Sequence, residues 1–452
     1  MKLDLTWFEL ARAAGGRLTS GEGGDAVQSL STDTRAFSAG QAFWALKGER
    51  FDAHDLLAKD PALAQKASGW IVERGRLPEG GPRPAHVVEV TSTMKAIQAL
   101  AAHHRRRFEI PVVGITGSNG KTTTKEMLKG ICRRVGATCA SPGNWNNQLG
   151  VPLSVLELLP EHRYGVFELA DSHPGDIDEV AKVAQPTVGV ITNLGADHLE
   201  FYGSMEANFK CKSELIENLP EEGKAVINAD DPWLAGLEPR LGARAVTFGL
   251  SPRARVNFED DGALVVDRHR LSLKLHAMGK LSRYNAAAAA AAAWALGIDL
   301  ENIRQGLEDY RPSAMRLEVL RHSTGCPLVL DAYNANPDSM RAAVEAFCAE
   351  YPAAKKILVL GDMKELGRDS RRFHAELGEW LAGLPLSGVF LGGPEMKAAA
   401  DALSALKTKF PVRYAEDPAQ WTPELKGQLT AGHAAFFKAS RAMKFESVAG
   451  AL

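Results

Sequence analysis

The sequence predicts an α/β protein built from several domains. A chain of 452 residues is long enough for about three domains of ordinary size. From Pro111 onward, short apolar runs alternate with helical stretches, which is the pattern of doubly wound sheets. One of these runs passes through a glycine-rich turn, Gly117–Gly120, and directly into a helix. A strand, a glycine-rich turn and a helix in this order are also typical of sheets whose strands run parallel.

The composition excludes several classes of protein. The chain has 53 Lys and Arg residues and 55 Asp and Glu residues, so its net charge is −2. This charge argues against a protein that coats nucleic acid. The five cysteines are scattered and form no CxxC pair, as in a reducing compartment. Asp4 and Glu9 argue against a signal peptide, and no run of about eighteen apolar residues is free of charge. We therefore expect a soluble cytoplasmic protein with no membrane span.

Residues 1–92 show short apolar runs between glycine-rich turns, which is typical of a small α/β unit. The expected strands are Gln41–Leu46, Trp70–Glu73 and His86–Val90. The expected helices are Leu5–Ala14 and Asp60–Ala67, followed by a longer helix, Thr93–Phe108, that leads into the next unit.

The rest of the chain contains continuous apolar runs, as buried parallel strands do. Those in the middle are Pro111–Thr116, Arg163–Leu169 and Pro186–Asn193, with helices expected over Thr122–Val135 and Phe209–Asn218. Those in the last third are Pro327–Ala332, Lys356–Leu360, Gly388–Leu391 and Ala434–Lys438, with helices Asp338–Ala349 and Arg371–Leu381. Asn285 precedes eight alanines, where we expect a helix N-cap.

The strongest motif is the segment Gly114–Thr124, which has the form of a P-loop between a strand and a helix. Its glycines let backbone N–H groups point at phosphate oxygens, and the helix N-terminus favours negative charge. Lys121 supplies a positive charge for the phosphates and Thr122 a hydroxyl for Mg²⁺. Ile115 stands where the usual spacing has its first glycine. The motif alone leaves kinase, GTPase, motor and ligase open.

Two further side chains come to the edge of the sheet that carries the P-loop. Glu168 ends one predicted strand and His198 lies just beyond another. Ligands bind at the carboxyl ends of parallel strands, where a carboxylate and an imidazole can hold a divalent cation. A second metal ion would suit phosphoryl transfer to a carboxylate. A loop histidine without a metal role is the plain alternative for His198.

The third block repeats this arrangement at its own strand ends. Arg316 follows a turn, Asp331 ends a strand, and polar turns follow the later strands. Together these residues predict a second binding edge. By contrast, Lys210 and Lys212 on one helix are typical of a solvent-facing surface.

Taken together, these segments resemble the Mur ligases, the ATP-dependent amino-acid ligases of peptidoglycan precursor synthesis. The resemblance runs in the family's order from about residue 30 to 445. The segments that carry it are Ser31–Arg35, Ala45–Asp55, the P-loop to Glu126, Gly143–Pro152, Asp331–Met340 and Gly361–Gly367. The greatest similarity is to the member that adds D-alanyl-D-alanine.

The resemblance implies three domains. They would be a UDP-substrate domain over 1–92, a central P-loop domain with a parallel sheet over 93–314, and a Rossmann-like domain for the incoming dipeptide over 315–452. The implied reaction activates the terminal carboxylate of UDP-N-acetylmuramoyl-tripeptide as an acyl phosphate, with release of ADP. The amino group of D-alanyl-D-alanine then attacks that carbonyl. A monomer acting only on small molecules is expected, together with ATP and two magnesium ions.

The resemblance also implies roles for matching residues. Those that would hold ATP are Gly117, Ser118, Asn119, Gly120, Lys121, Thr122, Thr123, Asn285, Arg316 and Asp331. Those that would hold magnesium are Thr122, Glu168, His198 and Lys212. Those that would contact the other substrates are Ser31, Arg35, Lys47, His54, Asn147, Asn334 and Asn336. Lys121, His198, Lys212 and Arg316 would act in catalysis.

Lys212 matches a lysine that related ligases carry as a carbamate, which would turn a cation into a metal-facing carboxylate. The segment before it departs from the family. Ala170 stands where relatives commonly have glycine, and Asp171 adds an acid.

Three alternatives remain. A sister ligase that adds a diamino acid would show an Asn-Pro-Arg segment, but Asp338 follows Asn336-Pro337 here. Folylpolyglutamate synthase would not match the first domain. A P-loop regulatory GTPase or nucleotide-gated binding module would need an Asn-Lys-x-Asp segment, and the sequence has none.

Overall fold

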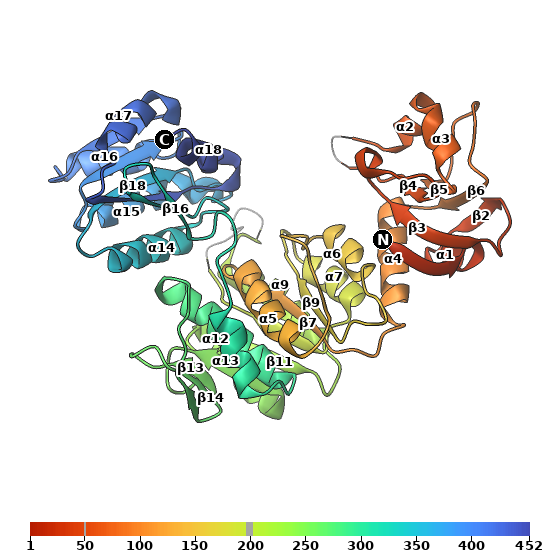
Figure 1. The fold of residues 1–452 in the computed structure, drawn as a ribbon, viewed down its shortest axis with the longest axis horizontal. Helices are drawn as coiled ribbons and strands as arrows, with labels where there is room; N and C mark the ends of the chain where they lie inside the picture. Colours follow the sequence, from red (N-terminus) through yellow and green to blue (C-terminus); the bar gives the residue numbers. More distant parts are fainter. Residues whose placement is uncertain (49–50, 196–201) are drawn as a thin grey trace.

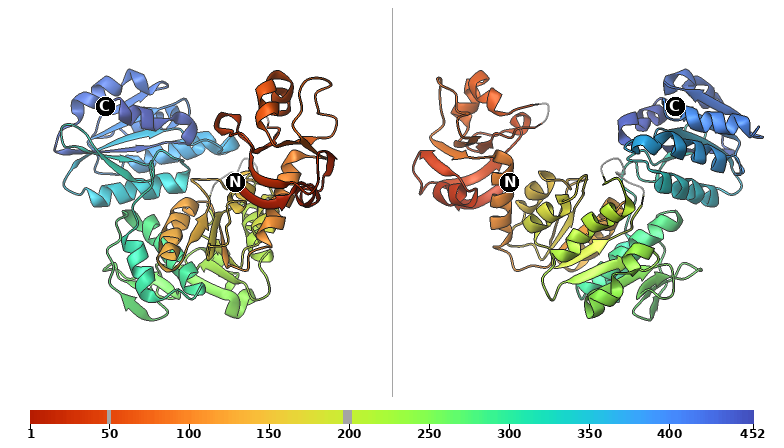
Figure 2. Two further views of the ribbon diagram at one scale, coloured as in Figure 1. Left: turned by 45° about the vertical axis from the view of Figure 1, so that its right-hand side comes forward. Right: turned by 180° about the vertical axis from the view of Figure 1, so that it is seen from behind.

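The computed structural model describes residues 1–48, 51–195 and 202–452, which form three sheets in chain order. Figure 1 shows the sheets with their helices as three bodies, and the first and third stand on opposite sides of the middle one. The right-hand view of Figure 2 shows the same separation from behind. The predicted boundaries after residues 92 and 314 fall between the sheets.

The first sheet has six strands in the order β1-β3-β4-β5-β6-β2. Their bounds are β1 Lys2–Thr6, β2 Arg17–Ser20, β3 Ala26–Ser31, β4 Ala42–Trp44, β5 Gly69–Glu73 and β6 His86–Val90. The helices are α1 Trp7–Ala13, α2 His54–Lys59 and α3 Pro61–Lys66. Trp7, Trp44 and Trp70 are fully buried.

The helix predicted over Leu5–Ala14 begins later than expected, because Leu5 belongs to β1. Thr6 ends that strand and caps α1 in a capping box with Glu9. The reciprocal hydrogen bonds satisfy backbone groups that a longer helix would otherwise leave open, so they fix where the helix begins.

The central sheet has nine strands in the order β15-β14-β13-β12-β11-β10-β7-β9-β8. Their bounds are β7 Val112–Thr116, β8 Thr138–Ala140, β9 Tyr164–Glu168, β10 Val188–Ile191, β11 Lys224–Asn228, β12 Ala245–Gly249, β13 Val256–Phe258, β14 Leu264–Val266 and β15 His269–Leu271. The strands from β8 to β13 run parallel, and β14 and β15 are antiparallel additions. The P-loop strand β7 lies between β10 and β9, in the parallel part of the sheet.

Helices cover both faces of this sheet. One face is covered by α5 Lys121–Val135, α12 Gly279–Ala295 and α13 Leu300–Glu308. The other carries α4 Thr93–Arg105, α6 Gly150–Val155, α7 Asp176–Ala184 and α9 Met205–Glu217. Two short helices, α10 Pro232–Ala235 and α11 Glu238–Leu241, follow β11.

The prediction of an N-cap at Asn285 is wrong. Helix α12 begins at Gly279, with the extended residue Met278 as its N-cap, so Asn285 lies inside the helix. All eight alanines from Ala286 are fully buried, which lets α12 lie close on α5 and the sheet. The side chain of Asn285 faces the P-loop rather than its own helix end.

The third sheet has six strands in the order β16-β17-β21-β18-β19-β20. Their bounds are β16 Glu318–Arg321, β17 Pro327–Leu330, β18 Lys355–Gly361, β19 Gly388–Gly392, β20 Val412–Ala415 and β21 His433–Lys438. Only β16 runs antiparallel to its neighbour. Helices α14 Pro337–Glu350, α15 Ser370–Leu381 and α16 Lys397–Ala405 cover one face, and α17 Thr422–Gln428 and α18 Phe445–Gly450 the other.

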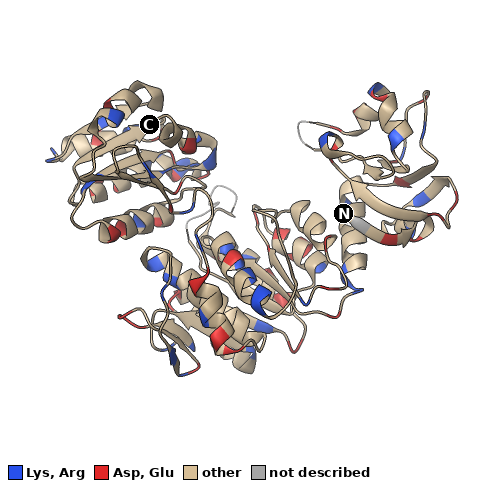
Figure 3. Cartoon of the chain, viewed as in Figure 1, with Lys and Arg blue, Asp and Glu red and all other residues tan. Residues whose placement is uncertain are grey.

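Charges of both signs are distributed over all three bodies, as Figure 3 shows. Among the described residues, no helix is long and apolar enough to cross a bilayer. The α/β fold class is as the sequence predicts.

Candidate active site

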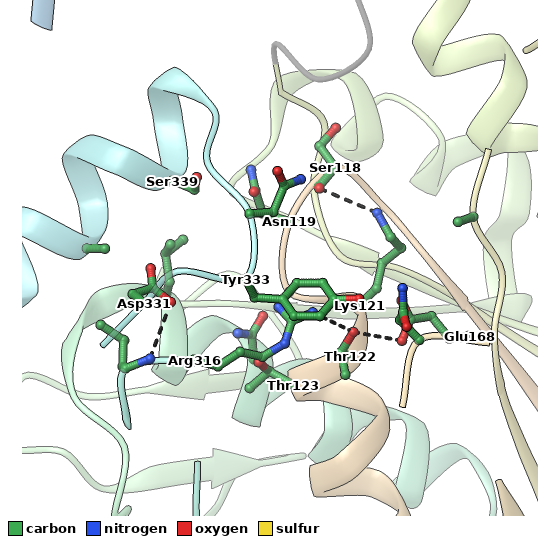
Figure 4. Close-up of a pocket in the computed structure, with 18 of the residues that line it drawn as sticks. Ser118, Asn119, Lys121, Thr122, Thr123, Glu168, Arg316, Asp331, Tyr333 and Ser339 are labelled. Atoms are coloured by element: carbon green, nitrogen blue, oxygen red, sulfur yellow. Dashed lines mark hydrogen bonds between the residues drawn. The ribbon is translucent and has the colours of Figure 1, made fainter. Parts of the chain in front are cut away.

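A cavity of about 390 Å³ lies where the carboxyl edge of the central sheet meets the third body (Figure 4). The central body contributes the P-loop, Glu168, Asp171 and part of α12. The third body contributes the turns after β17 and the start of α14. The predicted residues that line the cavity are Ser118, Asn119, Gly120, Lys121, Thr122, Thr123, Asn147, Glu168, Asn285, Arg316, Asp331 and Asn334. Residues far apart in the sequence thus share one site.

The P-loop takes a conformation that only glycine allows at two positions. Gly117 and Gly120 have φ values of 136° and 86°. A Cβ atom on Gly117 would lie 2.0 Å from Thr192 Oγ1, and one on Gly120 would lie 2.0 Å from Asn285 Oδ1. The loop is therefore packed tightly between β10 and α12, with the N-terminus of α5 open to the cavity.

Thr122 is the centre of a hydrogen-bond network that joins the two bodies. Its hydroxyl donates to Glu168 Oε2 at 2.8 Å, and Arg316 Nη2 donates to the same hydroxyl oxygen at 2.9 Å. Figure 4 shows Thr122 between these two side chains. The Lys121 amino group, one residue earlier, donates to Gly117 O at 2.5 Å.

The Glu168 carboxylate is buried and held on both sides. While Oε2 accepts from Thr122, Oε1 accepts from the Asn146 amide at 2.8 Å. The loop that carries Asn146 is tied to α5 by Lys125, whose buried amino group donates to Ser141 O and Gly143 O at 2.8 and 2.6 Å. Asn147 Oδ1 accepts a hydrogen bond of 2.8 Å from the backbone N–H of Gly150, at the start of α6.

The third body presents a second set of charged groups. The Arg316 guanidinium lies 4.0 Å from the centre of the Tyr333 ring, which fixes the plane of the cation. Asp331 accepts from Lys438 at 2.5 Å, and Lys438 also donates to Asn334 O at 2.8 Å. Asp331, Tyr333 and Asn334 follow β17, and Lys438 is the last residue of β21, the neighbour of β17 in the sheet.

Asn336 connects the two bodies directly. It is the N-cap of α14, in a capping box with Ser339, and its amide donates to Asn119 Oδ1 at 3.0 Å. Asn336 is buried, and its hydrogen bond to Asn119 is a direct contact between the third body and the P-loop.

A buried ion pair lies at another wall of the cavity. Lys212 Nζ lies 2.9 Å from Asp171 Oδ2 and 3.3 Å from Oδ1. The Tyr202 hydroxyl donates to the same carboxylate at 2.5 Å. Burial acts to raise the pKa of the Asp171 carboxyl, but the positive charges of Lys212 and Lys121 outweigh it and hold that pKa below its usual range. The prediction that Lys212 lies on a solvent-facing surface is wrong, because its side chain is fully buried.

The predicted residues of the first domain lie outside this cavity. Arg35 is exposed and paired with Asp33, and Lys47 is exposed as well. His54 is buried, and both of its ring nitrogens have partners: Asp52 Oδ1 at 2.6 Å and the N–H of Glu73 at 2.9 Å. The structure therefore places His54 as a support of its loop. His198 lies outside the described residues.

Several residues of the site were not predicted as functional. They are Asn146, Lys125, Tyr333, Ser339 and Lys438. Each of them lies at a strand end or in a segment that carries the family resemblance. Their closeness to these motifs in the sequence was therefore the only indication of a role in the site. Which member of a segment faces the cavity depends on the folded loop.

The donor set around Thr122 and Glu168 fits a magnesium ion. Mg²⁺ is commonly bound by one or two protein oxygen ligands together with phosphate oxygens and water. A hydroxyl and a carboxylate meet that requirement beside a phosphate loop. Among the described residues, no group of three or more His, Cys, Asp or Glu side chains is arranged to hold a metal ion.

The sequence matches two domains of one enzyme family. The Mur ligase middle domain matches residues 115–293, and the Mur ligase glutamate ligase domain matches residues 315–441. The UDP-N-acetylmuramoyl-tripeptide–D-alanyl-D-alanine ligase of Synechocystis is 33% identical over 431 residues, which cover 94% of this chain and 92% of the relative. The chain belongs to the Mur ligase family.

Solved Mur ligase structures agree with the fold. MurF from Acinetobacter baumannii superimposes with a TM-score of 0.91 at 31% identity, over 100% of this chain and 99% of that one. MurF from Thermotoga maritima in complex with ADP superimposes with a TM-score of 0.82 at 31% identity, over 94% of this chain and 96% of that one. The predicted family and its three-domain architecture are confirmed.

Proposed function

We propose that this Mur ligase joins D-alanyl-D-alanine to UDP-N-acetylmuramoyl-tripeptide and releases ADP and phosphate. The observation that carries the proposal is the single cavity in which the P-loop of the middle body meets Arg316 and Asp331 of the third. The chain aligns across nearly its whole length with UDP-N-acetylmuramoyl-tripeptide–D-alanyl-D-alanine ligases. A cavity lined by both bodies can hold an activated carboxylate and an incoming amine next to each other.

The residues of the cavity fit formation of an acyl phosphate. A carboxylate oxygen of the tripeptide attacks the γ-phosphorus of ATP, the bond to the bridging oxygen breaks, and ADP leaves. Lys121 would bind the phosphates, and Arg316, fixed in plane by Tyr333, would offset charge on the transferred group. The dipeptide amine then attacks the carbonyl carbon and phosphate leaves. Nearby cations would stabilise the tetrahedral oxyanion.

Thr122 and Glu168 would hold a magnesium ion beside the P-loop, and His198 is proposed for a second. Such an ion would offset negative charge on the phosphate oxygens. Asn146 would keep the Glu168 carboxylate oriented. The carbamate predicted at Lys212 stays a prediction.

The first body would bind the UDP end of the substrate. Ser31, Arg35 and Lys47 lie on or near the loops after β3 and β4. Hydrogen bonds from Arg35 lower the pKa of Asp33 to about 2 and hold the exposed guanidinium in place. An exposed arginine and lysine suit an anionic diphosphate. Asn147 would contact the same substrate, and Asn334 would meet the dipeptide. We propose that the enzyme acts as a monomer in the cytoplasm.

The test measures ADP release in two reactions. One contains UDP-N-acetylmuramoyl-tripeptide and D-alanyl-D-alanine, and the other contains UDP-N-acetylmuramoyl-dipeptide and a diamino acid. We expect turnover only in the first, with a loss of at least about 100-fold in Lys121→Ala because a positive charge aimed at the phosphates is removed. Turnover only in the second would identify the sister ligase. Turnover in neither, with ATP still bound, would leave a nucleotide-gated binding module.

A further inference from the structure

One end of the cavity is formed by the start of α7. Asp176, the first residue of this helix, lines the cavity. One turn further on, Glu179 accepts hydrogen bonds from two side chains of α4, Lys95 at 2.7 Å and Gln98 at 2.5 Å. Helix α4 directly follows β6 of the first body, and Figure 1 shows α7 on the side of the middle body that carries α4. Asp176 therefore lies on the side from which a substrate held by the first body would enter the cavity.

The carboxylate of Asp176 is fixed in orientation and keeps one oxygen for a ligand. Its Oδ2 accepts from the backbone N–H groups of Ser172 and His173, both at 2.8 Å. Within the part of the chain that the structure describes, Oδ1 has no hydrogen-bond partner, and the side chain is 21% exposed. Asp171, the other acid of this wall, is already paired with Lys212. A group held in place by its surroundings loses little conformational entropy when a ligand binds.

The charges that line the cavity differ between its two sides. Among the described residues, the Lys and Arg side chains that line it are Lys121, Arg316 and Lys438, which belong to the P-loop and the third body. The lining residues of the loops after β8 and β9, up to Asp176, are neutral or acidic. Because a cleft lined by one sign of charge attracts the opposite sign, the phosphates favour the first side and a cation favours the second.

Of the proposed substrates, the tripeptide can bring a cation to this side. ATP carries no cationic group, and the dipeptide amine has to lose its proton before it attacks the carbonyl carbon. A tripeptide made by a ligase that adds a diamino acid ends in a residue with a second amine. The reacting carboxylate and that side chain belong to the same residue, so a carboxylate at the P-loop brings the side chain into the cavity.

We propose that Asp176 determines specificity for the tripeptide by accepting a hydrogen bond from the side-chain ammonium group of its third residue. The inference rests on the ligase function proposed above. The chemistry that Asp176 recognises is an ammonium group at the end of an aliphatic side chain, which lysine and diaminopimelate share. Asp176 acts in binding and takes no part in the transfer of the phosphoryl group.

The test measures binding without turnover. Isothermal titration calorimetry compares UDP-N-acetylmuramoyl-tripeptides that end in lysine, diaminopimelate or norleucine, with ATP and the dipeptide left out. We expect the wild type to bind the first two about tenfold more tightly, because norleucine lacks the ammonium group and its charge-assisted hydrogen bond. In Asp176→Asn this preference should disappear while the Kd for the norleucine peptide stays the same. Loss of affinity for only one of the two ammonium peptides would identify the one whose ammonium group reaches Asp176.

The matched control is Asp178→Asn, on the same turn of α7. Asp178 is paired with Lys182 at 2.6 Å and does not line the cavity, so we expect wild-type affinities. Asparagine at position 176 keeps an oxygen that can accept from Ser172 and His173, which preserves the loop. Equal losses for all three peptides in Asp176→Asn would show a structural role only and would overturn the proposal.

Two further outcomes would overturn it. One is equal affinity of the wild type for the lysine and norleucine peptides. The other is an Asp176→Asn variant with unchanged tripeptide binding and a raised KM for D-alanyl-D-alanine in ADP release, which would place the acid at the incoming amine. Failure of every UDP-tripeptide to bind would contradict the proposed function as well, whereas equal binding of all three contradicts only the role of Asp176.

Discussion

At the scale of single residues, the orientation of the Glu168 carboxylate is fixed by two neutral side chains. Thr122 donates to one oxygen of the carboxylate and Asn146 to the other. The carboxylate is therefore held in one orientation before any cation binds. Residues that orient a metal ligand commonly change metal affinity by about 10- to 100-fold when they are removed.

Asn146→Ala tests this arrangement. We expect the Mg²⁺ concentration for half-maximal ADP release to rise about tenfold, because Glu168 loses the hydrogen bond that orients it. The measurement is a magnesium titration at saturating ATP. The matched control is Asn302→Ala, which makes the same change on the surface of α13, where Asn302 bonds Asp299. Equal magnesium curves for wild type and Asn146→Ala would contradict the role of Asn146.

At the scale of elements, α5 does more than present its N-terminus to the cavity. Lys125, on its second turn, reaches the loop that leads to Asn146 and Asn147. The helix therefore holds two walls of the site at once. Glu126, its neighbour on α5, pairs with both Lys125 and Lys129.

The two lysines of α5 form a matched pair for a stability measurement. Lys125 is fully buried and Lys129 is 22% exposed, and both lie 2.8 Å from Glu126. We expect Lys125→Met to lower the free energy of unfolding by about 3 kcal/mol, because it leaves Glu126 and two carbonyl groups without their buried cation. Lys129→Met should cost less than about 1 kcal/mol.

Urea unfolding of both variants gives the comparison. Equal destabilisation in the two would show that burial of Lys125 does not matter. A stable Lys125→Met with weakened substrate binding would place its effect in the loop rather than in the fold.

At the scale of the whole molecule, the proposed substrate contacts lie on bodies that stand apart. Arg35 and Lys47 belong to the first body, whereas Arg316 and Asp331 belong to the third (Figure 1). The P-loop and the third body already touch through Asn119 and Asn336. A substrate held by its UDP end and by its peptide carboxylate must span the first and middle bodies.

We therefore predict that ligands bring the bodies closer together. The measurement is small-angle X-ray scattering of the enzyme alone and with UDP-N-acetylmuramoyl-tripeptide and a non-hydrolysable ATP analogue. The radius of gyration should fall, because contacts with both ends of the substrate favour a closed arrangement. The Lys121→Ala variant, in which we expect weaker binding of the analogue, serves as the control. Similar curves with and without ligands would count against closure.

The sequence predicted several strongly patterned elements well. The strand His86–Val90 and the helix that follows the P-loop agree with the structure to within a residue. Among the strands that were not predicted are β13, β14 and β20, whose three or four residues carry little periodicity and stand in no longer apolar run. The cap expected at Asn285 failed because the local preference of asparagine is outweighed when a helix continues through it.

Some features of the site were found from the sequence, and others only from the tertiary structure. The sequence alone determined the P-loop, the family and the order of the motifs, because these depend on residues that are neighbours in the chain. Only the tertiary structure decided that Arg316 meets Thr122, that Asn146 meets Glu168, and that Lys212 is buried against Asp171. Such partners are brought together by packing across sheets and domains, and packing depends on the whole chain rather than on any local pattern.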